Sequence, residues 1–346
     1  MAMAVATSAA LLAACGGGAS GKTEFEPDPL TQTVPASSIP ADTPPEPGVF
    51  RLVGEPSLTY DLVRAGAGHG FFSQEGLAVR ILDTDSGAAA GGALRAGTAD
   101  GAIVAADEAL ALAAGGQRLR IVLLLTSLTV AEQLVAREGI DDVAGLAGAR
   151  IAFAPGSDGE LLVRGALASA DVPAAGVSLV PAPDPGRLLL DGAADAATVD
   201  AARAAELVTA DPALQPIATA GDQPGLLSRV LVVRDDVAAT KPGQVLAFVR
   251  AWQDLYLYER DDPEVATADL AMRTRQPVAD AAAALAGISL YDVPANAVEL
   301  FPGGEFYDRT MRAIGAASTA AGRLDHPVDE VALLDGAFAQ TVATGG

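Results

Sequence analysis

The stretch AGHGFFSQEGLAVRIL, residues 67–82, decides how the rest of the chain is interpreted. Its first part ends a helix-like segment, residues 58–72, that Gly66, Gly68 and Gly70 weaken by ~1 kcal/mol each relative to alanine. Residues 78–82 then alternate in character, as a β-strand does. A helix followed within a few residues by a strand is typical of an α/β fold.

The same alternation extends in both directions from this stretch. Strands that alternate with helices predict parallel sheets covered on both faces, and the chain contains two such series. We expect a strand at residues 229–233 that returns to the first series, and an almost entirely helical tail after residue 240. The first series has strands at 50–53, 78–82, 101–104 and 120–125 and helices at 58–72, 87–96 and 106–114; the second has strands at 149–153, 177–180 and 196–199 and helices at 158–170, 184–191 and 201–209.

A weak internal repeat links the two series. Residues 93–102 (ALRAGTADGA) and residues 188–197 (LLLDGAADAA) both place a glycine at the end of a helix, Gly97 and Gly192, where left-handed dihedral angles are needed. In both segments an aspartate follows three residues later, and small residues then begin a strand. The alternative is a coincidence in an alanine-rich chain. Two equivalent lobes would face each other across a cleft, where ligands commonly bind.

Composition restricts the classes of function. The 346 residues carry a net charge of −22, from 44 acidic and 22 basic residues, so the surface repels nucleic acid. Hydrophobic residues make up 50% of the chain, which is enough for a large folded core. One cysteine, Cys15, and two histidines argue against an intrachain disulfide, most metal sites and most Cys/His catalysis. We expect no metal, no cofactor and no nucleic-acid partner.

The N-terminal segment has the features of a lipoprotein signal. Residues 4–14 are apolar but too few to span a bilayer, which takes ~20 residues. The run ends in Leu12-Ala13-Ala14-Cys15, which resembles the bacterial lipobox, and a glycine-rich tether follows at residues 16–21. The alternative is a lone buried cysteine at the start of a helix. We predict a signal peptide at residues 1–14 and a lipidated Cys15.

Prolines and small polar residues dominate the segment after the cysteine. We expect residues 15–48 to be a lipidated, disordered linker that holds the folded part away from a membrane. The folded part is predicted to comprise lobe one, residues 49–132 plus 236–346, and lobe two, residues 133–235.

Several segments together resemble one family. Residues 67–79 resemble the pattern A-x-x-x-G-F-F-x-x-E-G-L-x-V of the nitrate/taurine/alkanesulfonate-type solute-binding proteins, a group that includes binders of thiamine pyrimidine precursors. Residues 93–102 resemble their A-L-x-x-G-x-x-D-x-A, and residues 143–157 are similar to their L-x-G-k-x-I-a-x-x-x-G-S region. Residues 230–236 look like the family's returning strand. The resemblance covers roughly residues 50–260.

The resemblance implies a type II periplasmic-binding fold, an α/β fold of two doubly wound lobes joined by two crossing strands, near residues 130–137 and 229–234, with a helical C-terminal tail. It also implies a monomeric, extracytoplasmic protein that is not an enzyme. Such proteins deliver a small polar ligand, here of sulfonate, nitrate or pyrimidine type, to the permease and ATPase of an ABC importer by closing a hinge. The lipid anchor would attach the protein to the outer face of the cell membrane.

Ligands of open α/β sheets bind beyond the carboxyl ends of the strands. Turns between a strand and a helix suit anions, because free N–H groups and the helix dipole point at the ligand. The alternative for each serine at such a turn is capping of its own helix. The candidate ligand-binding residues are Ser57, Thr59, Tyr60, Ser86, Gly87, Thr126, Ser127, Gly156, Ser157, Asp158 and Thr198.

Other residues leave the class of ligand open. Tyr60 is predicted either to contact the ligand or to lie on a helix surface, and Trp252 to lie in the core. Three arginines, Arg187, Arg203 and Arg229, are candidates for binding an anion. Glu55 and Asp85 near the expected site instead favour a cationic or amine-bearing ligand.

Two other functions compete with solute transport. One is a cytoplasmic enzyme on the same fold, of the menaquinone-pathway lyase type, which the lipobox argues against. The other is a lipoprotein that senses a ligand for a signalling partner or has a structural role.

Overall fold

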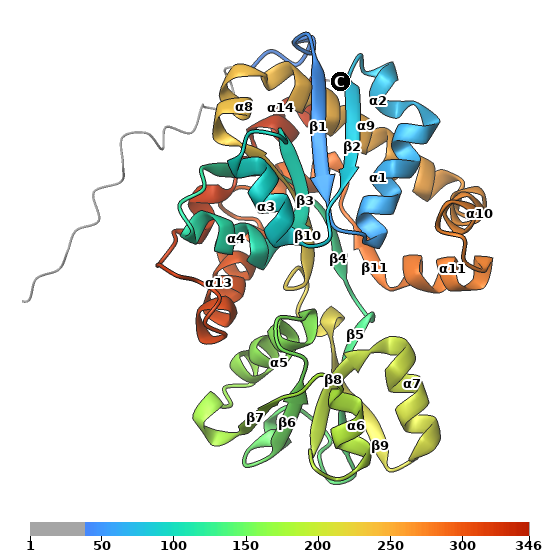
Figure 1. Cartoon of the computed structure of the whole chain (residues 1–346), viewed down its shortest axis with the longest axis vertical. Helices are drawn as coiled ribbons and strands as arrows, with labels where there is room; N and C mark the ends of the chain where they lie inside the picture. The colour runs from blue at the N-terminus through green and yellow to red at the C-terminus, as the bar shows by residue number, and fades with distance from the viewer. Residues whose placement is uncertain (1–38, 346) are drawn as a thin grey trace, which may run out of the picture. The chain divides into compact units, whose positions relative to one another are not determined.

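Two β-sheets carry the fold in the computed structural model, which describes residues 39–345 (Figure 1). The strands are β1 Val49–Gly54, β2 Ala78–Asp83, β3 Gly101–Ala105, β4 Leu119–Leu128, β5 Glu132–Arg137, β6 Arg150–Phe153, β7 Ser178–Pro181, β8 Ala196–Asp200, β9 Leu214–Thr219, β10 Ser228–Arg234 and β11 Ile288–Leu290. The first sheet has six strands in the order β11-β4-β10-β3-β1-β2, and the second has five in the order β7-β6-β8-β5-β9.

Helices follow most strands and continue to the C-terminus. They are α1 Leu58–His69, α2 Phe71–Gln74, α3 Gly87–Arg95, α4 Ala106–Ala114, α5 Asp158–Ser169, α6 Pro185–Leu190, α7 Ala201–Ala210, α8 Asp235–Thr240, α9 Pro242–Asp261, α10 Pro263–Thr274, α11 Val278–Ala286, α12 Val293–Glu299, α13 Met311–Ala320 and α14 Ala337–Thr344. The predicted alternation of strands and helices is therefore confirmed in both series.

Both faces of the first sheet are covered by helices. Phe50 and Leu52 of β1 point into a core that α1 and α9 share, whereas Val53 packs in a second core with α3 and α4. Trp252 of α9 is 1% exposed, and its Nε1 donates a hydrogen bond of 2.8 Å to the carbonyl oxygen of Tyr291. The interpretation of Trp252 as a core residue is confirmed.

The second sheet is built in the same way. Leu134 of β5 packs in a core with α5, and its neighbour Val135 points to the other face, where α6 and α7 lie. Successive residues of a strand point to opposite faces, so a strand covered on both sides is apolar at consecutive positions.

The chain crosses between the sheets twice, between β4 and β5 and between β9 and β10 (Figure 1). β10 pairs with β3 and β4 of the first sheet, as expected for a returning strand. The predicted boundary at residues 235/236 assigned this strand to lobe two, although its hydrogen bonds lie in the first sheet. The exact limits of the two lobes stay a prediction.

The internal repeat is present in three dimensions. Gly97 and Gly192 have φ values of 67° and 73°, in the left-handed region. Asp100 accepts hydrogen bonds from the backbone N–H and the guanidinium of Arg51 in β1. Asp195 makes the same bonds with Arg150 in β6, so each sheet uses one aspartate to hold the start of a strand.

The predicted signal peptide and the lipidated Cys15 lie outside the described residues, as does most of the predicted linker. The described end of the linker is not disordered as expected, because Glu46 accepts hydrogen bonds from the N–H groups of Gly243 and Gln244 and Ile39 packs against the core of the first sheet. Within residues 39–345, no helix combines the length and the apolar character that crossing a bilayer requires.

Candidate ligand-binding site

Four strands of the first sheet have their carboxyl ends in one row, and in this section 'edge' means that row of strand ends. β1, β2, β3 and β4 run in the same direction, and β10 runs against β3 and β4. The start of β10 therefore lies at this edge, with Arg229 opposite Ala105 and Thr126. Parallel strands place the residues that follow them together, so β1 brings Glu55 here and β3 brings Asp107 and Glu108.

Most of the predicted residues at this edge have partners within the protein. Ser57 and Ser86 cap α1 and α3, accepting hydrogen bonds from the backbone N–H groups of Tyr60 and Ala89 at 3.3 Å and 3.2 Å. The hydroxyl groups of Thr59 and Thr126 are buried and lie 2.7 Å apart. Ser127 bonds to the hydroxyl of Tyr291 at 3.2 Å. The capping alternative is thus confirmed for Ser57 and Ser86.

Tyr60 requires a correction. It is 0% exposed and belongs to the core of the first sheet, and its hydroxyl donates a 2.7 Å hydrogen bond to the carbonyl oxygen of Leu82. Tyr60 is therefore neither a helix-surface residue nor free to bind a ligand, because β2 covers it. We remove it from the candidate set.

Gly87, the first residue of α3, lies against a carboxylate of the protein itself. A Cβ atom placed on Gly87 would stand 1.5 Å from Oε2 of Glu108. A side chain at this position would force the flexible end of Glu108 to move. The Glu108 carboxylate therefore lies beside the first residue of α3.

The second sheet has a corresponding edge. β6, β7, β8 and β9 run in the same direction and β5 runs against them, so the start of β5 lies where β6 and β8 end. Gly156 adopts a φ of 78° in the turn after β6. Its N–H donates to Oε2 of Glu160 at 2.9 Å, and the Ser157 hydroxyl donates to the carbonyl oxygen of Ala154 at 2.7 Å. The Ser157 side chain does not cap α5.

Two predicted residues at this edge have polar groups that matter for a ligand: Asp158, through an ion pair, and Thr198, through a free hydroxyl. Oδ2 of Asp158 forms an ion pair of 3.0 Å with Nη2 of Arg229, which joins the edges of the two sheets. Thr198 is 3% exposed and its Oγ1 has no hydrogen-bond partner. Nη1 of Arg229 is also buried and unpartnered. Arg229 is thus the cation that the sequence only included among three candidates.

The other two candidate arginines lie elsewhere. Nε of Arg187 bonds to Asp191 at 2.8 Å, and Nη1 of Arg203 bonds to Glu206 at 2.9 Å, in both cases within the same helix and on its surface. Asp85 lies in the turn before α3.

Sequence reasoning missed Glu132 and Asp200. The β5–β8 register places them directly opposite each other. The available signal was Glu132 itself, an acidic residue at the first position of the strand that follows the crossing. A strand that is antiparallel to its neighbours begins beside the carboxyl ends of those neighbours. We call Glu55, Asp107, Glu108, Glu132, Asp158, Thr198, Asp200 and Arg229 the strand-end cluster.

Burial and repulsion between carboxylates raise two pKa values in this cluster. The pKa of Glu108 rises to about 7, mainly through burial and then through Glu55 and Asp107, against the opposing effect of Arg229 and Arg323. The pKa of Glu132 rises to about 8, again mainly through burial, with Asp158 and Asp200 adding to the effect. Burial, which disfavours the charged form of a carboxylate, is the largest cause in both cases.

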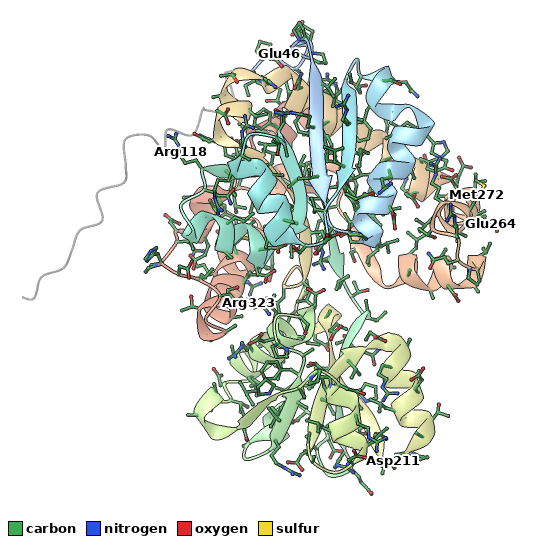
Figure 2. The ribbon with its side chains drawn as sticks, in the orientation of Figure 1. Glu46, Arg118, Asp211, Glu264, Met272 and Arg323 are labelled. Atoms are coloured by element: carbon green, nitrogen blue, oxygen red, sulfur yellow. The ribbon has the colours of Figure 1, made fainter. Side chains whose placement is uncertain are left out.

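Arg323, which follows α13, supplies a second link between the sheets (Figure 2). Nη1 donates to Oδ2 of Asp107 at 2.5 Å, and Nη2 donates to the Ser157 carbonyl oxygen and to Oε2 of Glu160, both at 3.1 Å. One guanidinium therefore binds both α4, which packs on the first sheet, and the start of α5, which packs on the second.

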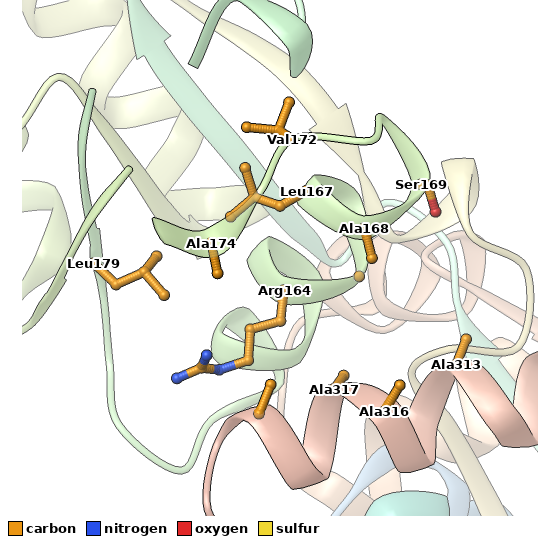
Figure 3. A pocket seen from close by; sticks show the side chains of 12 residues that line it. Arg164, Leu167, Ala168, Ser169, Val172, Ala174, Leu179, Ala313, Ala316 and Ala317 are labelled. Atoms are coloured by element: carbon orange, nitrogen blue, oxygen red, sulfur yellow. The ribbon is translucent and has the colours of Figure 1, made fainter. Parts of the chain in front are cut away.

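A cavity of about 550 Å³ lies where α5 and α13 meet (Figure 3). Its lining is mostly small and apolar, including Ala168, Ala313, Ala316 and Ala317, and the Arg164 guanidinium is bonded to Glu160. A small polar ligand needs convergent polar groups, which this lining lacks. We therefore place the candidate site at the strand-end cluster.

The donor set of the described residues does not favour a metal centre. Among residues 39–345, no group of three His, Cys, Asp or Glu side chains is arranged to hold a metal ion.

Comparisons with known proteins agree on the fold. The family described as NMT1/THI5 like matches residues 63–266, more than half of the chain. The periplasmic aliphatic sulphonate binding protein SsuA from Escherichia coli superposes with a TM-score of 0.64 at 16% identity, over 82% of this chain and 96% of that protein. The periplasmic nitrate-binding protein NrtA from Synechocystis gives 0.55 at 14%, over 84% and 86%.

A further structure supplies the name of the architecture. A Candida albicans protein, described as exhibiting the generic periplasmic binding protein fold, gives a TM-score of 0.58 at 14% identity, over 82% of this chain and 94% of that one. The predicted fold and the resemblance stated from the sequence are confirmed. SsuA and NrtA are described as binding proteins, not enzymes, which agrees with the prediction for this chain. No curated protein matches the sequence.

Proposed function

Because the chain belongs to the NMT1/THI5-like family, we propose that it is the substrate-binding lipoprotein of an ABC importer. In this proposal Cys15 carries the lipid that anchors the protein to the outer face of the cell membrane. The folded part acts as a monomer, captures a small polar ligand and delivers it to a permease and its ATPase.

The observation that carries the proposal is that two of the seven unpartnered buried side-chain atoms of residues 39–345 lie beside the first turn of α5, Thr198 next to Gly159 and Arg229 next to Asp158. Thr198 Oγ1 comes from the second sheet and Arg229 Nη1 from the first, and neither has a hydrogen-bond partner among residues 39–345. A buried polar atom without a partner costs ~1–3 kcal/mol, so native proteins rarely keep one without a reason. A ligand that lies between the strand ends and supplies these partners is such a reason.

The two crossings of the chain supply the expected hinge. They lie at residues 129–131 and 220–227, and both are short segments between strands of different sheets. Hinges are a few residues at the ends of elements that absorb changes in φ and ψ. We infer that closure about these segments brings the strand ends of both sheets onto the ligand.

The first candidate ligands are those of the structural relatives. SsuA is described as a sulphonate binder and NrtA as a nitrate binder. Pyrimidine-type compounds are the further class that the sequence resemblance implies.

Thermal unfolding of the purified protein with a panel of sulfonates, nitrate, pyrimidines, amino acids and amines tests the function. A true ligand at 100 times its Kd stabilises the native state by ~2.7 kcal/mol. In Arg229→Lys, which loses the unpartnered nitrogen, the shift with the same ligand should shrink, whereas the exposed control Arg187→Lys should keep it. Unchanged unfolding curves across the whole panel contradict a solute receptor.

A further inference from the structure

Two carboxylates face each other without a cation at the start of β5. Glu132 lies directly opposite Asp200 in the β5–β8 pairing. Like charges in directly opposed positions of a sheet destabilise it. Asp200 accepts a hydrogen bond of 2.8 Å from the Arg203 N–H and so caps α7. Within the described part of the chain, no lysine or arginine forms an ion pair with Glu132.

The first turn of α5 packs directly onto this pair. A Cβ atom on Gly159 would lie 2.5 Å from Oγ1 of Thr198 and 2.6 Å from Oε1 of Glu132. The carboxylate and the hydroxyl are therefore neighbours at the same point of the helix. Thr198 lies two residues before Asp200 on β8, on the same face of the strand, and its 3% exposed side chain has no hydrogen-bond partner.

Anions are disfavoured at the helix N-termini around this point. The Glu108 carboxylate lies against Gly87, the first residue of α3, and would repel an anion there. At the N-terminus of α5, the Gly156 N–H is bonded to Glu160, and Asp158 occupies the first position. Arg229 and Arg323 are already paired with Asp158 and with Asp107 and Glu160. Among the residues that the structure describes, none forms an ion pair with Glu55, Glu108, Glu132 or Asp200.

We propose that Glu132, Asp200 and Thr198 form a subsite for the ammonium group of the transported solute, which is an amine or a zwitterion and not a simple anion. This inference rests on the proposed function and names the class of ligand for the same site. An ammonium group donates several hydrogen bonds, and the two carboxylates and the hydroxyl oxygen of the subsite accept them. The unpartnered Nη1 of Arg229 accommodates an anionic group on the same molecule.

An organic cation fits these residues better than a metal ion does. In residues 39–345 no three acidic, His or Cys side chains converge as a metal requires, and the subsite has only two carboxylates and one hydroxyl. The raised pKa of Glu132 agrees with a site that holds a proton when no cation is bound. The charged groups that act on Glu132 are Asp158 on α5 and Asp200 on β8, and Arg229 pairs with Asp158.

Calorimetric titration of the purified protein with compounds that differ by one charged group tests the subsite. Taurine carries both charges, ethanolamine carries only the ammonium group, and ethanesulfonate carries only the sulfonate. We expect taurine or ethanolamine to bind and ethanesulfonate to bind at least about 30-fold more weakly, because a buried charge loses its partner. Binding of the amine should also strengthen from pH 6 to pH 8, as the proton on Glu132 is displaced.

Substitution of Glu132 tests whether its carboxylate binds the ammonium group. Glu132→Gln should weaken amine binding by at least about 30-fold. The control is Glu138→Gln, because Glu138 is an exposed carboxylate that follows the other end of β5, and this variant should leave binding within about twofold. Circular dichroism confirms that both variants fold.

Each other outcome is decisive. Ethanesulfonate or nitrate binding as tightly as taurine, or unchanged amine binding in Glu132→Gln, overturns the ammonium subsite while the solute-receptor proposal stands. No binding by any amine, zwitterion or anion overturns both.

Discussion

Asp100 and Asp195 each bind the backbone N–H and the guanidinium of an arginine at the start of a strand, but they differ in burial. Asp100 is 0% exposed and forms two ion pairs, with Nε of Arg51 at 2.8 Å and with Nζ of Lys241 at 3.3 Å. Burial raises its pKa, but the hydrogen bonds from Arg51 outweigh this effect and lower the pKa to about 2. The side chains of Asp195 and Arg150 are 30% and 45% exposed, so water screens that pair.

We therefore expect Asp100→Asn to lower the free energy of unfolding by about 3 kcal/mol at pH 7, because it leaves two partly buried cations without their carboxylate. Asp195→Asn should cost clearly less. The pKa of Asp100 is lower in the folded than in the unfolded chain, so its contribution is present above pH ~4 and is lost as the pH falls toward 2. Urea unfolding of wild type and both variants between pH 7 and pH 3 measures this. Equal losses in the two variants would contradict it.

At the scale of elements, small residues allow helix α3 to approach α4. A Cβ atom on Gly91 would lie 2.1 Å from Cδ2 of Leu112, whereas a Cβ atom on Gly92 would meet nothing within 4 Å. Neighbouring glycines of one helix therefore have different roles. Gly91 provides space for packing, while Gly92 only adds backbone entropy to the unfolded state.

Gly91→Ala is expected to destabilise the protein by ~1–3 kcal/mol, because Leu112 must leave its position in the core. Gly92→Ala should stabilise it by ~0.5–1 kcal/mol through higher helix propensity. Differential scanning calorimetry of the two variants measures both effects. The same sign of change in both would show that Gly91 is not constrained by Leu112.

Two strands were not predicted from the sequence, for reasons that belong to this scale. β9 contains Pro216, which argues against a strand in the interior of a sheet, but β9 lies at the edge of the second sheet, where proline is tolerated. β11 has three residues and is also an edge strand, too short to show a period. Their existence depends on the neighbouring strands β5 and β4 more than on their own residues.

At the scale of the whole molecule, α5 and α13 make a loosely filled contact that Arg323 holds. The alanine-lined cavity of about 550 Å³ lies in this contact, so dispersion between the helices is weak there. Arg323 binds Asp107, Glu160 and the Ser157 carbonyl oxygen, and its side chain is 18% exposed. The link between the sheets on this side thus depends strongly on one guanidinium.

Arg323→Ala should lower the free energy of unfolding by about 3 kcal/mol, since Asp107 would stay buried without its cation, whereas Glu160 would keep its ion pair with Arg164. Hydrogen exchange at residues 156–160 should accelerate in the same variant. Arg309, whose side chain is 74% exposed and pairs with Glu305, provides the control, and Arg309→Ala should resemble wild type. Unaltered exchange at residues 156–160 in Arg323→Ala would refute the link.

The family was indicated by the resemblance of motifs such as residues 67–79. Local residue patterns were sufficient to predict the two series of strands and helices, the returning strand at residues 229–233 and the paired Gly-x-x-Asp segments. They could do so because periodicity, helix ends and turns depend on neighbours in sequence. Tertiary structure alone decided that Tyr60 lies in the core, that Glu108 lies against Gly87 at the start of α3, that Arg229 pairs with Asp158, and that Glu132 lies opposite Asp200. Each of these depends on which strands pair and in which register, and residues far apart in sequence, such as Asp158 and Arg229 at 71 positions, then share one environment. Burial and charge at the site arise from that pairing, so they have no signature in the residues taken one segment at a time.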